Sequence, residues 1–116
     1  MSYTLLRSLD RISRVRGVRG SMFVAAEDGL PIVHLTMEDV NAKTVAAFAA
    51  SLARKVSGAA AATDAGRLRF VQMQTEHGVL LVAPSGDMLV AVVADPAVNV
   101  GLARLEMMRA LEAAQQ

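Results

Sequence analysis

The sequence predicts an α/β chain of the α+β type, in which helices cover both faces of one antiparallel sheet. The first observation behind this prediction is an unbroken apolar run of seven residues, 88–94, with turn-forming residues on both sides. The run is too short for a typical helix and does not alternate apolar with polar residues, so it is expected to form a strand buried on both faces. The second observation is the order of the patterned segments: a helix, a hairpin, a long helix, a three-strand meander and a last helix.

Composition narrows the class of protein. A chain of 116 residues with 53% hydrophobic and 20% charged residues is expected to fold as one domain over residues 1–116, and disorder is excluded. No apolar run approaches the roughly 20 residues of a membrane helix, and residues 1–10 lack the pattern of a secretory signal. The absence of cysteine excludes disulfides and thiolate metal sites and fits a cytoplasmic location. The net charge of +1 gives no overall attraction to nucleic acid or to a membrane.

Residues 3–16 have the pattern of an amphipathic helix, because apolar residues recur at steps of three and four. Arginines line the opposite side and continue beyond the helix: Arg7, Arg11, Arg14, Arg16 and Arg19. Such a stripe could bind phosphates or an acidic partner. A solvated helix face is the simpler interpretation, because no aromatic residues alternate with the arginines to stack on bases.

Residues 21–26 and 30–35 are expected to form two antiparallel strands joined at Asp28-Gly29. A tight hairpin turn needs a positive φ, which glycine adopts at little cost. Pro31 places the second strand at an edge of the sheet, because it has no backbone N–H to donate. His34 has no carboxylate or second histidine close in sequence, so it is interpreted as an edge or packing residue rather than a base or metal ligand.

The long helix is expected over residues 40 to about 62, with Glu38 and Asp39 near the positive end of its dipole. At about 100° of turn per residue, its apolar residues fall into two stripes. The stripe interpreted as the core face consists of Val45, Phe48, Ala49, Leu52 and Val56. Beside it runs an alanine stripe, consisting of Ala42, Ala46, Ala50, Ala53, Ser57 and Ala60. We interpret the alanine stripe as the contact surface for the same helix of a second subunit; the alternative is that alanine is simply a good helix former facing water.

The rest of the chain is expected to form strands at residues 68–74 and 79–83, then the central strand, and finally a helix over residues 97–114. His77 lies in the turn between the first two of these strands and is expected to be exposed and inert. The apolar stripe of the last helix is expected to consist of Val98, Leu102, Leu105, Met108 and Leu111.

The sequence contains no motif typical of catalysis. No glycine is followed by lysine, which excludes the phosphate loop of nucleotide hydrolases. Two histidines far apart and the lack of cysteine argue against a transition-metal site. Ser85 lies in a turn with no histidine partner, and no two carboxylates are placed for acid and base catalysis. The chain is therefore predicted not to be an enzyme and to bind no cofactor or metal.

Three stretches resemble the roadblock/dynein light chain family: GVRGSMFVAAEDGLP at residues 17–31, GDMLVAVVA at residues 86–94 and NVGLARLE at residues 99–106. The resemblance covers essentially the whole chain, and an alanine-rich helix lies between the first two stretches. It implies the element order α-β-β-α-β-β-β-α and a five-stranded antiparallel sheet of order 2-1-5-4-3. It also implies a homodimer in which the third strand, about residues 67–74, pairs with its twin and the two long helices lie together.

By the same resemblance, the implied function is regulation of a small Ras-like GTPase by a non-catalytic homodimer, as in the bacterial gliding-protein B type. That regulator repositions the catalytic groups of the GTPase, although an arginine finger from Arg54 or Arg67 is a further route to activation. A passive dimeric scaffold for motor, kinase or membrane-associated complexes is the alternative. A nucleic-acid accessory would use Arg7, Arg11, Arg14 and Arg19. Neither a nucleic-acid partner nor membrane insertion is expected.

The predicted site residues form two groups, neither of them catalytic. The dimer interface is predicted at Ala42, Ala46, Ala50, Ala53, Ser57, Leu68 and Phe70. The GTPase is predicted to bind the exposed rim of the paired long helices, at Lys43, Ala47, Ser51, Arg54 and Lys55.

Overall fold

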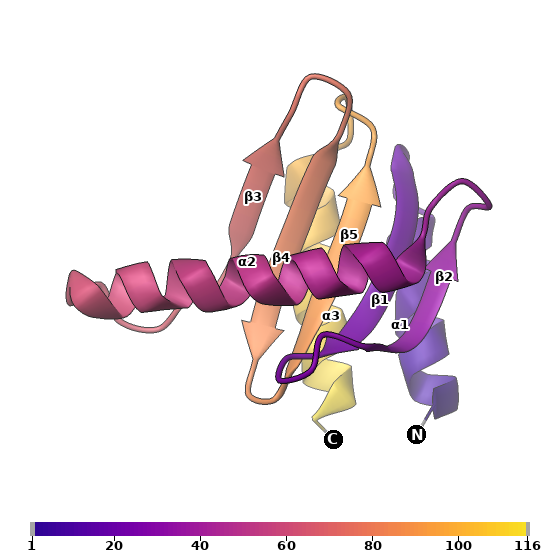
Figure 1. Cartoon of the computed structure of the whole chain (residues 1–116). Helices are drawn as coiled ribbons and strands as arrows, with labels where there is room; N and C mark the ends of the chain where they lie inside the picture. The colour runs from indigo at the N-terminus through magenta and orange to yellow at the C-terminus, as the bar shows by residue number, and fades with distance from the viewer. Residues whose placement is uncertain (1, 116) are drawn as a thin grey trace.

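The computed structural model describes residues 2–115, and Figure 1 shows their arrangement. The elements follow in the order α1 (Ser2–Ser13), β1 (Val18–Ala25), β2 (Pro31–Thr36), α2 (Ala42–Ala62), β3 (Val71–Gln74), β4 (Val79–Ser85), β5 (Met88–Ala94) and α3 (Val100–Ala114). This sequence of elements confirms the predicted order α-β-β-α-β-β-β-α. In Figure 1, α2 crosses one face of the sheet, and α1 and α3 lie on the other face.

The strands form one antiparallel sheet of order β2-β1-β5-β4-β3, which confirms the predicted order. The central strand is β5, which pairs with β1 on one side and with β4 on the other. At one edge lies β2, as expected from Pro31. The opposite edge is β3, whose outer side pairs with no strand of residues 2–115.

The central strand is buried on both faces, as its composition predicts. Leu89 and Ala91 belong to the apolar cluster under α2, whereas Val90 and Val92 belong to the cluster under α1 and α3. All four side chains have an exposed fraction of 0%. Burial of apolar surface stabilises a fold by about 25 cal/mol per Å2, so the two clusters supply the main driving force for folding.

Asparagine residues form the N-caps of α2 and α3. Oδ1 of Asn41 accepts a hydrogen bond of 3.0 Å from the backbone N–H of Thr44, and Asn99 caps α3 in the same way. Both helices therefore begin later than predicted, because the cap satisfies a backbone N–H that has no partner inside the helix. Asp39, expected beside the start of α2, instead forms an ion pair with Arg19 of β1.

Strand β1 begins at Val18, three residues before its predicted start, and Gly20 lies within it. A Cβ atom on Gly20 would lie 3.0 Å from Cγ2 of Thr36 and 3.2 Å from Cγ2 of Val93. Glycine therefore lets β1 pass closely between its two neighbouring strands.

Strand β3 begins at Val71 rather than at residue 68. Its ladder with β4 starts at the pair Val71 and Val82. Continuing the same register would place Pro84 opposite residue 69, and proline has no N–H to donate to the ladder. Residues 66–70 therefore cross from α2 to the sheet without pairing to β4.

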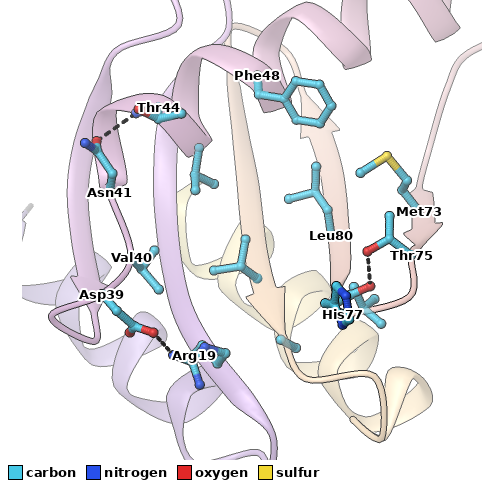
Figure 2. A pocket seen from close by; sticks show the side chains of 15 residues that line it. Arg19, Asp39, Val40, Asn41, Thr44, Phe48, Met73, Thr75, His77 and Leu80 are labelled. Carbon is cyan, nitrogen blue, oxygen red and sulfur yellow. Dashed lines mark hydrogen bonds and ion pairs between the residues drawn. The ribbon is translucent and has the colours of Figure 1, made fainter.

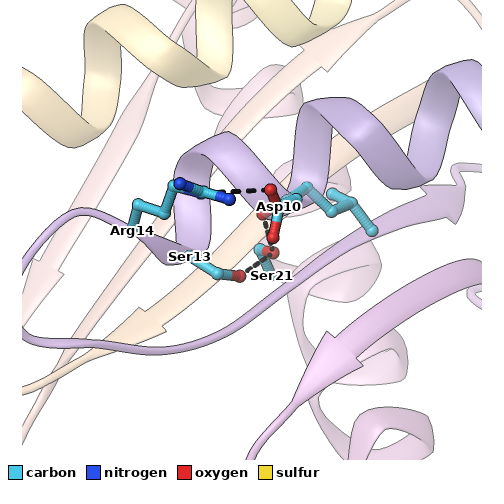
Figure 3. A network of polar contacts seen from close by, with 5 residues as sticks. Asp10, Ser13, Arg14 and Ser21 are labelled. Carbon is cyan, nitrogen blue, oxygen red and sulfur yellow. Dashed lines mark hydrogen bonds and ion pairs between the residues drawn. The ribbon is translucent and has the colours of Figure 1, made fainter.

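One buried hydroxyl joins α1 to the sheet. Ser21 of β1 is 0% exposed, and its Oγ donates a hydrogen bond of 3.3 Å to the backbone oxygen of Leu9. The same Oγ lies 3.1 Å from Oγ of Ser13, where α1 ends three residues earlier than predicted (Figure 3). Because a buried hydroxyl without a partner is costly, these bonds favour one position of α1 on the sheet.

Replacing Ser21 by alanine is expected to lower the free energy of unfolding by about 1 kcal/mol, because both hydrogen bonds of this buried hydroxyl are lost. Urea unfolding followed by circular dichroism measures the change. Ser8→Ala, at a half-buried position of α1, is the matched control and is expected to leave the midpoint nearly unchanged. Equal midpoints for Ser21→Ala and the unaltered chain would show that the bonds contribute no stability.

Candidate functional site

Three residues of the alanine stripe, Ala46, Ala50 and Ala53, face the sheet of the same chain, so that part of the predicted assignment is wrong, whereas Ala49 of the predicted core face is buried as expected. The buried residues of the helix are Ala46, Ala49, Ala50 and Ala53, with exposed fractions from 0% to 6%. Large side chains of β1, β4 and β5 stand beneath the helix: Met22, Leu80, Val82 and Leu89. Because these fill the layer between helix and sheet, only small side chains fit on the helix side. Ala46, Ala50 and Ala53 are therefore not available to a second subunit, contrary to the predicted interface.

The larger apolar residues of α2 lie at its side, with part of their surface in water. Val45, Leu52 and Val56 are half-buried, and Phe48 is 49% exposed. These four residues are called the free flank of α2 below. A row of large apolar side chains left in water on one helix is typical of a contact surface for another molecule.

A groove of about 440 Å3 lies between the sheet and the part of the free flank that contains Val45 and Phe48. Figure 2 shows Phe48 on the helix side of the groove, with Met73 of β3 and Leu80 of β4 on the sheet side. The ion pair between Arg19 and Asp39 lies at its rim. An apolar floor with a polar rim fits the apolar side chains of a partner rather than a metal ion.

The end of α2 extends past the edge strand β3, as Figure 1 shows. Among residues 57–62, Ala60 is half-buried and the others are exposed. The outer edge of β3 has no partner strand in residues 2–115. An uncovered helix end and an unpaired strand edge therefore occur together on one side of the molecule.

A partial exchange of faces occurs on α3, where Leu111 of the predicted apolar stripe is buried as expected. Its buried residues are Ala103, Met107, Ala110 and Leu111. Leu102 and Leu105, which were expected in its core stripe, are 42% and 46% exposed, so that part of the prediction is wrong. Phe23 of β1 and Leu81 of β4 are buried in the cluster under this helix and take up part of its volume, so two of the four buried residues of α3 are alanines.

The remaining predicted site residues lie partly or fully at the surface. Of the predicted interface, Ser57 is exposed, and Ala42, Leu68 and Phe70 are half-buried. Of the predicted GTPase surface, Lys43, Ala47, Arg54 and Lys55 are exposed, and Ser51 is half-buried. Nη1 of Arg54 donates a hydrogen bond of 3.0 Å to the backbone oxygen of Ala26, in the turn that follows β1. Arg67 is exposed in the segment between α2 and β3, so the two candidate finger arginines lie in different places.

Within residues 2–115, no group of three or more histidine and carboxylate side chains could hold a metal ion. In the same part of the chain, no helix combines the length and the apolar character needed to cross a bilayer. The free flank of α2 and the groove beside it form an exposed apolar surface of the kind that contacts other proteins.

The family model described as Roadblock/LC7 domain matches residues 5–95. The chain therefore belongs to the Roadblock/LC7 family. Two uncharacterised proteins of Methanocaldococcus jannaschii are 34% and 33% identical to it over 106 residues, which cover 91% of this chain and 92% of each relative.

Solved structures show the same fold at low sequence identity. A Roadblock/LC7 domain from Streptomyces avermitilis has a TM-score of 0.84 at 19% identity, covering 99% of this chain and 94% of that one. The gliding protein MglB from Thermus thermophilus has a TM-score of 0.82 at 22% identity, covering 96% and 85%. MglB from Myxococcus xanthus has a TM-score of 0.85 at 16% identity, covering 97% and 85%.

Proposed function

We propose that this chain is a non-catalytic, homodimeric subunit that binds a small Ras-like GTPase and regulates its hydrolysis of GTP. Membership of the Roadblock/LC7 family and the structural likeness to MglB support this function. The proposal depends on one observation. The free flank of α2, the groove beside it and the unpaired edge of β3 together resemble one side of a contact between two subunits. A passive dimeric scaffold is the alternative that the experiment below separates.

The proposed dimer has a twofold axis beside β3, so that β3 pairs with its twin. Antiparallel pairing would satisfy the free backbone N–H and C=O groups along Val71–Gln74. The same twofold rotation places the projecting end of each α2 over the sheet of the partner subunit, close to the groove and the free flank of that subunit. Phe48 would then lose its exposure to water. A solved MglB with a tetrameric arrangement gives further support to self-association in this fold.

The GTPase is proposed to bind the outer surface of the paired α2 helices, which stays open when the free flanks meet. Lys43, Arg54 and Lys55 are exposed there and give the surface a positive charge. A positive surface favours association with an acidic one and raises the association rate. The hydrogen bond from Arg54 to Ala26 ties this surface to the β1–β2 turn.

Adding the chain to purified Ras-like GTPases of the same organism, each loaded with GTP, is expected to increase phosphate release by the cognate GTPase. Reversing two charges with Lys43→Glu and Lys55→Glu is expected to weaken binding of that GTPase about tenfold or more, measured by fluorescence anisotropy. The matched control reverses Arg7 and Arg11 to glutamate on α1, which lies on the other face of the sheet, and is expected to change binding less than about twofold.

The outcomes separate the two candidate functions. Binding without any change in phosphate release would refute the regulator and leave the scaffold. Equal weakening by the two double variants would refute the proposed binding surface, and failure to bind any of the GTPases would refute the GTPase as partner.

A further inference from the structure

A basic stripe runs along the outer side of α1. Arg7, Arg11 and Arg14 are exposed there, on the side of the helix that faces away from the sheet. Arg14 pairs with Asp10 at 3.1 Å (Figure 3), and the guanidinium carbon of Arg7 lies 5.8 Å from the ring centroid of Tyr3. Within residues 2–115, Arg11 has no carboxylate at ion-pairing distance.

The charge of the chain is concentrated in this segment. Residues 1–16 contain four arginines and one aspartate, a net charge of +3 in a chain whose net charge is +1. The remaining residues therefore carry a net charge of −2. The helix dipole favours Arg11, which lies in the last turn of α1, but it does not account for Arg7 in the middle of the helix. Of the other two predicted members of the stripe, Arg16 is exposed beyond the end of α1, and Arg19 lies on β1 and pairs with acidic residues.

Exposed apolar side chains occur on the same side of the molecule. Helices α1 and α3 lie on one face of the sheet, and their outer surfaces point away from it (Figure 1). Tyr3 and Leu6 of α1 are 71% and 40% exposed, and Leu102 and Leu105 of α3 are exposed to a similar degree as Leu6. The outer surface of α1 and α3 thus combines arginines with apolar side chains that are exposed to water.

We propose that the outer surface of α1 and α3 binds the surface of an anionic phospholipid bilayer. Guanidinium groups bind phosphate oxygens in a bidentate manner, and each arginine near an anionic membrane strengthens binding about fivefold. The tyrosine and leucine side chains enter the headgroup region, where an amphipathic ring and short apolar side chains are stable. Nucleic acid would use the arginines but offers no apolar contact to the leucines. The contact is peripheral, and it does not rest on the proposed GTPase function.

Vesicle flotation tests this proposal with the whole chain. Vesicles that contain about one third phosphatidylserine are expected to bind the chain at low salt, whereas phosphatidylcholine vesicles are not. Changing Arg7, Arg11 and Arg14 together to glutamine is expected to lower the partition coefficient about a hundredfold. Leu102→Ser with Leu105→Ser is expected to lower it several-fold, because the apolar contribution is lost. The single variant Arg11→Gln, expected to lose about fivefold, replaces the triple variant if that one misfolds by circular dichroism.

The matched control removes the same charge elsewhere, by changing Lys43, Lys55 and Arg67 to glutamine. It is expected to keep vesicle binding within about threefold of the unaltered chain. Lack of binding to phosphatidylserine vesicles, or an equal loss in the two triple variants, would overturn the proposal. Binding of a DNA duplex through the same arginines without vesicle binding would overturn it in favour of nucleic acid. GTPase binding is measured on the same samples, and its result does not affect the test of membrane binding.

Discussion

Ala50→Glu is expected to unfold the chain, or to lower its free energy of unfolding by about 4 kcal/mol or more. Ala50 is 1% exposed and lies in the apolar cluster between α2 and the sheet. A carboxylate at this position would lose its hydration, and the longer side chain would push the helix away from the sheet. Domains are stabilised by only about 5–15 kcal/mol, so the loss is large. Urea and thermal unfolding followed by circular dichroism measure it.

Ala47→Glu is the matched control, because it makes the same substitution at an exposed position of the same helix. Its effect on the free energy of unfolding is expected to stay within about 0.5 kcal/mol.

The two interpretations of the alanine stripe also differ in what they predict for Ala50→Glu. A subunit interface predicts a folded monomer, whereas a core position predicts loss of the native circular dichroism spectrum. A stable, folded Ala50→Glu monomer would contradict the packing of α2 on its sheet.

The central strand and one edge strand of the sheet could be predicted from the sequence, because the residues of a strand themselves indicate how far it is buried. Successive residues of β5 point to opposite faces, so an apolar residue at every position of Met88–Ala94 requires cover on both faces. Pro31 marks an edge strand for an equally local reason, its missing N–H. The strand order came from the family resemblance, which rests on glycines and small residues spread along the chain.

The faces of α2 and α3 could not be predicted in this way, because periodicity separates two stripes without saying which one meets the sheet. The volume of side chains on the sheet decides that question, and under α2 it is filled by Met22, Leu80 and Leu89. Phe48 and Leu102 fit the pattern of core residues by size and spacing, yet both are left in water. The candidate contact surface of α2 therefore lies beside the alanine stripe, at the free flank.

Phe48→Glu is expected to dissociate the proposed homodimer while each subunit stays folded. Phe48 is 49% exposed in the single chain, so a charge there costs the subunit little, but in the dimer it would replace the largest side chain of the free flank at the centre of the contact. Loss of a central aromatic residue costs an interface about 2–4 kcal/mol, which weakens self-association about thirtyfold to a thousandfold. Sedimentation velocity over a series of concentrations measures the dissociation constant.

Ala47→Glu again serves as the control, since it adds the same charge on the opposite flank of α2, beside the β1–β2 turn. It is expected to leave the dissociation constant within about threefold, because that flank stays open in the proposed dimer. Circular dichroism of Phe48→Glu must match that of the unaltered chain, which separates dissociation from unfolding. A Phe48→Glu chain that stays dimeric would place the contact elsewhere than the free flank, and a chain that is monomeric without any substitution would remove the dimer from the proposed function.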